Sequence, residues 1–358
     1  MTVCAIEMTT TAAFRIAADG SYAARLAGEG DALYAERWTL AGPEPYAVPL
    51  PLAQPEEADS EVLPLADGRV LIHRRVAERH AFALLYPTGA GAGPSTGELQ
   101  LGGVAVREDV RVRLLPPCPA GSAAFVLAAE ETVSTVWQVA GGLSGPRPVA
   151  RIPGRCSGGV WLDRAGRLLA LDRELDGTSK AVAVDLGRAE VSPLLQITED
   201  SDDRLLLADP DSGLLLIRSD APGTSRLGWG VSGSSLPVRF PECLARLGDA
   251  YPFAVQPGQS LMPETCGVAL RLPEGDIGLW RPADRRVFRL GAPAGWLGGA
   301  GLWSPQGRLH LPYATPEVPC GIVGLNLPAA PPPPVVLAQT APTAPRPVPL
   351  QQAPLAGR

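Results

Sequence analysis

The sequence predicts an all-β fold, a seven-bladed β-propeller followed by a disordered, proline-rich C-terminal tail. Two observations carry the propeller prediction: glycines of the kind found in tight turns recur at a regular spacing, and short apolar runs flank each of them. A third observation, the loss of any hydrophobic period beyond residue 327, predicts the tail. The alternatives are another all-β sandwich or barrel, or a mixed fold.

The repeating glycines stand 45 to 53 residues apart. This is the period of propeller blades, each a four-stranded antiparallel sheet. Glycine suits the position because a tight turn needs positive φ, which a residue without Cβ adopts at little cost. The seven positions are Gly20, Gly68, Gly121, Gly166, Gly213, Gly258 and Gly307.

Each glycine is expected to separate the first two strands of its repeat. The clearest repeats are the fourth, WLDRAGRLLALD at 161–172, and the fifth, LLLADPDSGLLLIRSD at 205–220. The sixth is the weakest, because Pro263 interrupts the run that should form its second strand. One helical turn is expected within 242–250. The seventh repeat lacks an outer strand, so the run at 3–9 is expected to pair with it and close the ring.

These patterns divide the chain into a propeller domain, 1–327, and a tail, 328–358. The tail contains four consecutive prolines at 331–334 and six more at 328, 342, 345, 347, 349 and 354. Such a tract favours extended, solvated polyproline II over packed structure.

Composition narrows the classes of partner and compartment. The formal net charge is -6 and no basic run occurs, which disfavours a nucleic-acid partner. No apolar run is long enough to cross a membrane, and the N-terminus does not read as a signal peptide. The six cysteines are scattered, as in a reducing cytoplasm. Lys180 is the only lysine, the other basic residues are Arg apart from three His, and Ala, Gly and Pro are abundant, which is typical of a GC-rich bacterial genome.

An acidic stretch offers one candidate metal site. Hard oxygen ligands at alternate positions in a turn can hold calcium, and the candidates are Asp200, Asp202, Asp209 and Asp211. The alternative is that these side chains cap backbone amides in turns. No transition metal and no cofactor are predicted, because the strands that carry His73, His80 and His310 are not expected to converge.

Two tryptophans in glycine-rich loops are candidate anchors for a protein partner. Trp229 lies in the run GWG and Trp296 in GWLGG, where a large ring can reach solvent and bury area on a partner. The alternative is that both rings pack in the core.

Repeats such as 161–172 and 205–220 are similar to those of NHL-like and gluconolactonase-like propellers. The resemblance covers about residues 3–327 and includes no family-specific motif. The gluconolactonase-like class implies a metal held by Glu, Asn and Asp in the central channel. This sequence departs from that pattern, since Asn326 is its only asparagine.

The sequence therefore favours a non-catalytic platform that binds a protein partner in the cytoplasm, with a small-molecule ligand as a further partner class. No catalytic motif is evident, so no catalytic residue is assigned. The alternative is a channel-site enzyme, a lactonase, lyase or cyclase acting on a small molecule. A rigid ring with variable loops serves either function.

Overall fold

The structure is a computed structural model that describes residues 14–89, 95–107, 109–258, 262–304 and 306–326. Within these residues nearly every regular element is a β-strand. The exceptions are α1 (Glu242–Ala245) and a short 3-10 helix, η1 (Pro263–Thr265). The predicted all-β fold is confirmed, and α1 is the helical turn expected within 242–250.

Four sheets contain four antiparallel strands each, paired in sequence order. The first two are β1 (Arg15–Ile16), β2 (Tyr22–Ala27), β3 (Tyr34–Thr39) and β4 (Tyr46–Leu50), then β5 (Glu61–Pro64), β6 (Val70–Val76), β7 (Arg79–Thr88) and β8 (Ser95–Ala105). The other two are β9 (Arg111–Leu114), β10 (Ala124–Ala129), β11 (Val133–Ala140) and β12 (Arg147–Pro153), and β20 (Tyr251–Val255), β21 (Val268–Arg271), β22 (Ile277–Trp280) and β23 (Phe288–Leu290).

Two further sheets depart from this plan. One has three strands, β24 (Leu302–Trp303), β25 (Arg308–Tyr313) and β26 (Gly321–Asn326). The other has seven strands: β13 (Arg155–Trp161), β14 (Leu168–Leu175), β15 (Thr178–Asp185), β16 (Glu190–Leu195), β17 (Asp203–Ala208), β18 (Leu214–Ser219) and β19 (Arg226–Val231).

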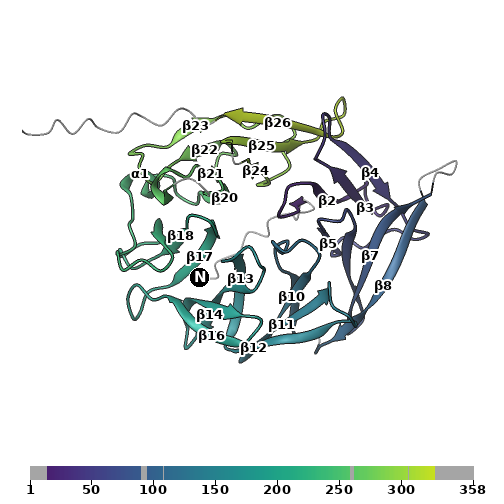
Figure 1. Cartoon of the computed structure of the whole chain (residues 1–358), viewed down its shortest axis with the longest axis horizontal. Helices are drawn as coiled ribbons and strands as arrows, with labels where there is room; N and C mark the ends of the chain where they lie inside the picture. The colour runs from purple at the N-terminus through teal and green to yellow at the C-terminus, as the bar shows by residue number, and fades with distance from the viewer. Residues whose placement is uncertain (1–13, 90–94, 108, 259–261, 305, 327–358) are drawn as a thin grey trace, which may run out of the picture. The chain divides into compact units, whose positions relative to one another are not determined.

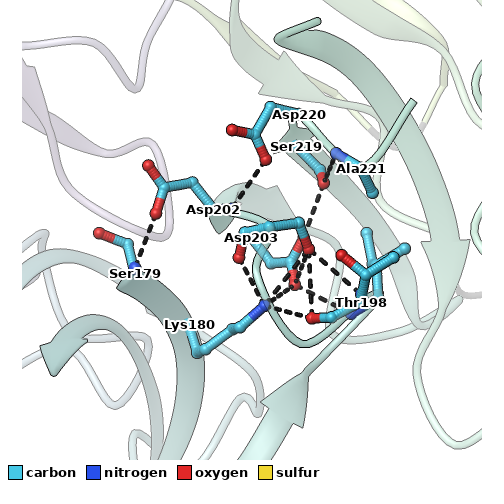
Figure 2. A network of polar contacts seen from close by, with 10 residues as sticks. Ser179, Lys180, Thr198, Asp202, Asp203, Ser219, Asp220 and Ala221 are labelled. Atoms are coloured by element: carbon cyan, nitrogen blue, oxygen red, sulfur yellow. Dashed lines mark hydrogen bonds and ion pairs between the residues drawn. The ribbon is translucent and has the colours of Figure 1, made fainter. Parts of the chain in front are cut away.

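The seven-stranded sheet consists of two antiparallel meanders, β13–β16 and β17–β19, joined by one parallel pair between Lys180 and Asp203. Figure 2 shows the polar network at this joint. Lys180 Nζ lies 2.9 Å from Asp203 Oδ2 and donates to the carbonyls of Thr198 and Ser201 at 2.6 and 2.5 Å. The Asp203 side chain is fully buried and also accepts from the Ser219 hydroxyl at 2.6 Å.

The prediction of seven separate four-stranded blades is therefore wrong. In the described residues the strands form six sheets, because the Lys180–Asp203 joint merges two meanders into one. The three-stranded sheet has no fourth partner among these residues. The run at 3–9, expected to supply it, lies outside the described residues, as does the whole predicted tail, 328–358.

The sheets follow one another around a ring, with the first strand of each nearest the centre (Figure 1). Apolar clusters fill the spaces between successive sheets. Leu63 and Phe82, for example, pack with Val126 of the next sheet. The first and last sheets also meet, since Phe14 and Trp38 pack with Ala300 and Ala314. The core thus alternates with the sheets around the ring, the arrangement of a β-propeller.

The repeating glycines lie where the sequence predicted them, between the first two strands of a meander. Six of the seven have φ between 67° and 86°; Gly258 is the exception. The sixth repeat is also where the predicted strands are wrong. Pro263, which has no N–H to donate, starts η1 within the run expected to form the second strand, and the second strand is instead the later run β21.

Candidate functional site

A cavity of about 520 Å³ lies among the innermost strands of the ring. Its walls come from β1, β5, β9, β13, β17 and β20, the first strands of successive meanders. These strands are far apart in sequence, and only closure of the ring brings them together. The cavity is therefore part of the central channel.

Two arginines of β9 supply much of the charge in this channel. Arg111 and Arg113 are two residues apart, so they lie on the same face of the strand, whereas Val112 and Leu114 are buried on the other face. Arg113 Nη2 donates to the carbonyl of Gly158 at 3.2 Å. Burial, and next the charge of Arg111, lower the pKa of Arg113. The two guanidinium groups therefore repel each other in a partly desolvated space.

Arg15 brings a third guanidinium group from β1. Its Nη2 lies 3.4 Å from Glu61 Oε1, while its Nη1 is buried and has no hydrogen-bond partner in the described part of the chain. Burial lowers the pKa of Arg15, and the nearby Glu61 only partly offsets this effect. The channel wall thus has three guanidinium groups and one carboxylate, Glu61, among its lining residues.

Glu61 is held by partners on three sides. Its Oε2 accepts from the Leu114 N–H at 2.6 Å and lies 3.7 Å from Nδ1 of His73, in addition to the contact with Arg15. Burial alone would raise the pKa of Glu61, but His73, Arg15 and the Leu114 N–H together hold it below its ordinary value. Glu61 is therefore ionised at neutral pH, and it balances only one of the three positive charges.

Two histidines extend this network outward through the second sheet. His73 Nε2 and His80 Nδ1 are 2.7 Å apart and both side chains are buried. Burial, and next the charge of His73, lower the pKa of His80 to about 4. The expectation that the histidines do not converge is therefore wrong for this pair. His310 is on β25, in the last sheet, and does not join them.

Asp172 approaches the channel from the second layer of strands. It lies on β14 behind Gly158 and Gly159, two glycines of positive φ at a bulge in β13. A Cβ at Gly158 would come within 3.0 Å of Asp172 Oδ2, so the missing side chain makes room for this carboxylate. Asp172 Oδ1 accepts from the Leu205 N–H at 3.0 Å. Burial raises the pKa of Asp172 to about 6.

Tyr251, the first residue of β20, completes the polar lining. Its ring is about half exposed, and the charge of Asp172 adds to burial in raising the pKa of its hydroxyl. The hydroxyl is therefore protonated at neutral pH and is able to donate a hydrogen bond. The channel offers guanidinium and phenol donors to a ligand, and the buried carboxyl of Asp172 lies behind the Gly158 part of its wall.

The sequence prediction missed these residues, although it contained a signal for them. The first strand of every repeat was expected to be an apolar or alternating run, and first strands surround the axis of a propeller. The channel residues Arg15, Glu61, Arg111 and Arg113 are charged positions within those runs. Asp172 had no such signal, since only the fold places it behind the Gly158 bulge.

The two tryptophans chosen as exposed anchors are not exposed loop residues. Trp229 is on β19 and only 3% exposed, because its glycine neighbours make room for packing: a Cβ at Gly228 would lie 2.8 Å from the Phe240 ring. Trp296 is half-buried and donates from Nε1 to the Ala300 carbonyl at 2.9 Å. The expected exposure is wrong for Trp229 and only partly met for Trp296.

The four aspartates proposed for calcium do not converge. Asp202 precedes β17 and accepts from the Ser179 N–H at 2.7 Å, as Figure 2 shows, whereas Asp209 follows the strand and accepts from the Ser212 and Gly258 N–H groups, each at 2.9 Å. Six strand residues separate them, about 20 Å. Asp211 pairs with Arg164, and Asp200 is exposed. The alternative interpretation, capping of backbone amides, accounts for Asp202 and Asp209, two of the four.

Other kinds of site find no support in the described residues. No group of three or more His, Cys, Asp or Glu side chains there is arranged to hold a metal ion. Every described cysteine is free, and burial raises the pKa of Cys156, which lies on β13. Neither helix in this part of the chain has the length and apolar character that a membrane span requires.

Comparisons with known proteins support the fold. No family model matches the chain, and no curated protein matches it. Among solved structures, an oligogalacturonate lyase from Vibrio parahaemolyticus is similar with a TM-score of 0.51 and 9% identity, over 90% of this chain and 92% of that one. The β-propeller domain of Cps50 (Swd1) from Myceliophteria thermophila gives 0.48 and 12%, over 88% and 97%.

A putative TolB from Agrobacterium tumefaciens is similar with a TM-score of 0.39 and 14% identity, over 89% of this chain and 90% of that one. The protein is a β-propeller. At these identities the matching structures bear on the fold alone.

Proposed function

We propose that this β-propeller binds a small anion in its central channel, through Arg15, Arg111 and Arg113. The observation that carries the proposal is the unbalanced charge: three guanidinium groups line a cavity of about 520 Å³ beside one carboxylate, in a chain whose formal net charge is -6. Two of the three have lowered pKa values because they are desolvated. A bound carboxylate or phosphate would relieve both the repulsion and the unsatisfied donors.

The test is calorimetric titration with succinate and with inorganic phosphate, using succinamide as the uncharged control. Arg113→Gln removes one charge-assisted contact and should weaken binding of either anion at least about tenfold. Arg188→Gln, in the exposed turn between β15 and β16, is the matched control and should leave affinity unchanged. Binding of succinamide as tight as that of succinate would rule out a site built for charge.

The interaction-platform hypothesis stays open in one concrete form. An acidic segment of a protein partner presents the same carboxylates as succinate, and it could bind at the rigid entrance of the central channel. A peptide rich in glutamate should then bind more tightly than succinate, and Arg113→Gln should weaken both. A partner that binds unchanged to Arg113→Gln would have to use another surface of the ring.

Turnover is the second candidate function, and the carboxyl of Asp172 favours it. A pKa of about 6 suits a general base or acid near neutral pH. Asp172 lies behind Gly158, one of the lining residues of the cavity, and Tyr251 in the lining supplies a second proton donor. Proton NMR of the anions that bind would reveal conversion. Asp172→Asn should then abolish conversion while leaving affinity within a few fold, whereas an unchanged rate would remove Asp172 from the reaction.

A further inference from the structure

A second cavity, of about 360 Å³, adjoins the channel where the first and last sheets meet. Its wall includes the β1–β2 turn and parts of β24, β25 and β26, together with Arg164 and Pro257 from two other turns. Ile16 lines both this cavity and the arginine-lined one. The two cavities are therefore neighbours at β1.

The lining of the second cavity is mostly apolar. Trp303 and Pro312 are buried, and the remaining apolar side chains are partly exposed toward the cavity or its mouth. Its two charged lining residues are Asp19, in the β1–β2 turn, and Arg164, which already pairs with Asp211. The main apolar lining residues are Leu40, Pro257, Leu302, Trp303, Pro312 and Ile322.

The order of residues along β1 explains why the two cavities differ. Side chains alternate along a strand, so Arg15 points toward the second sheet and reaches Glu61, whereas Ile16 packs on the opposite side, against the cluster of Phe14 and Trp38. A charged compartment and an apolar compartment are thus adjacent, and Ile16 of β1 is in the wall of both.

We infer that the ligand is an amphipathic anion, whose charged head lies among Arg15, Arg111 and Arg113 and whose apolar body fills the second cavity. The inference rests on the proposed anion site and adds the class of ligand: an acyl or aryl carboxylate or phosphate rather than a fully hydrophilic anion. Each cavity falls within the size range of small-molecule sites, and an apolar wall with a few convergent charges is their usual composition.

The experiment measures affinity along a homologous series of acetate, butanoate, hexanoate and octanoate, with octanol as the uncharged control. Each methylene that enters the second cavity should tighten binding about fourfold until the cavity is full. Arg113→Gln should weaken the whole series by one common factor, because it acts on the head group alone. Octanol should bind far more weakly than octanoate.

A variant at the mouth of the second cavity tests whether the gain in affinity with chain length arises there. Ala18 is exposed in the β1–β2 turn and lines this cavity, so Ala18→Trp should obstruct it with little effect on folding. In this variant acetate should bind as before and the gain with chain length should disappear. Ala18→Ser is the matched control and should keep the gain. A melting temperature within a few degrees of the parent shows that Ala18→Trp still folds.

The outcomes separate this inference from the proposed function. If acetate binds but longer chains bind no better, the amphipathic ligand is refuted and the anion site stands. If the gain with length persists in Ala18→Trp, the apolar body does not lie in this cavity and the inference is also refuted. If neither acetate nor phosphate binds at all, the anion site itself fails, and the inference fails with it.

Discussion

At the scale of single residues, Asp172 is the clearest case of a side chain whose chemistry the fold sets. Its carboxyl is buried on β14. The hydrogen bond that it accepts from the Leu205 N–H does not offset the cost of burying a charge. Its pKa is therefore raised to about 6. In the unfolded chain the same group titrates near 3.8. Folding thus favours the protonated form.

The first prediction concerns Asp172→Asn and pH. Between pH 3.8 and 6 the native state holds a proton that the unfolded state has released, so Asp172 lowers stability as pH rises through this window. Asparagine does not titrate. The unfolding free energy of the variant should therefore rise relative to that of the parent by about 3 kcal/mol between pH 3.5 and 7.5. Urea unfolding of both proteins across this range measures the difference, and parallel curves would contradict the raised pKa.

Residue-level prediction from the sequence was the least successful. Trp229 was expected in solvent because glycines flank it, but those glycines make room for Phe240 in a packed strand. The three histidines were not expected to converge, yet two of them, His73 and His80, are diagonal neighbours across β6 and β7. Both errors have one cause: which face of a strand a side chain occupies depends on the sheet packed against it, and spacing along the chain does not contain that information.

At the scale of elements, the bulge in β13 is the feature that shapes the channel. Strand pairing between β13 and β14 shifts between Ser157 and Val160, which places Gly158 and Gly159 out of register. Both have positive φ, and a Cβ at Gly159 would lie 2.8 Å from Leu115. Glycine is required here for the backbone conformation and for the space it leaves.

The second prediction compares alanine at two glycines of similar φ. Gly158 (φ 75°) faces Asp172, whereas Gly177 (φ 80°) is in the β14–β15 turn, where a Cβ would meet nothing within 4 Å. Gly177→Ala should cost only backbone strain, about 1 kcal/mol. Gly158→Ala should cost more, since its methyl crowds the Asp172 carboxylate, and it should also weaken succinate binding. Equal decreases in unfolding free energy for the two variants, measured by urea unfolding, would show that the bulge tolerates a side chain.

At this scale the sequence predicted the regular meanders well. The runs at 161–172 and 205–220 contain the β13–β14 and β17–β18 turns, with Gly166 and Gly213 at positive φ. The sixth repeat was not predicted well, because Pro263 replaced an expected strand with η1. Alternating apolar strands are a local property of sequence, whereas a long connection between two strands is not.

At the scale of the whole molecule, the repeat predicted the fold because each meander needs neighbours on both faces. Apolar clusters between successive sheets bury what a single sheet leaves exposed, which is why a regular period implies a ring. The number of separate sheets did not follow from the period. A single buried pair, Lys180 with Asp203, joins two meanders, and no periodic signal specifies such a contact.

The third prediction concerns the segment beyond residue 327. Residues 328–358 have no apolar period with which to pack on the ring, so their deletion should leave the melting temperature nearly unchanged. Calorimetry of the full chain beside a 1–327 form measures the difference. A fall of more than about 5 °C, roughly a couple of kcal/mol for a domain of this size, would mean that the segment packs on the propeller.

The joint between β15 and β17 has a consequence for chemical labelling. Lys180 is the only lysine of the chain, its side chain is 14% exposed, and its amine is bonded to Asp203 and two carbonyls. A reagent that acylates primary amines therefore has a single side-chain target, and it can react only while that joint is open. The rate of acylation at Lys180 therefore reports how often the contact between the two meanders opens locally.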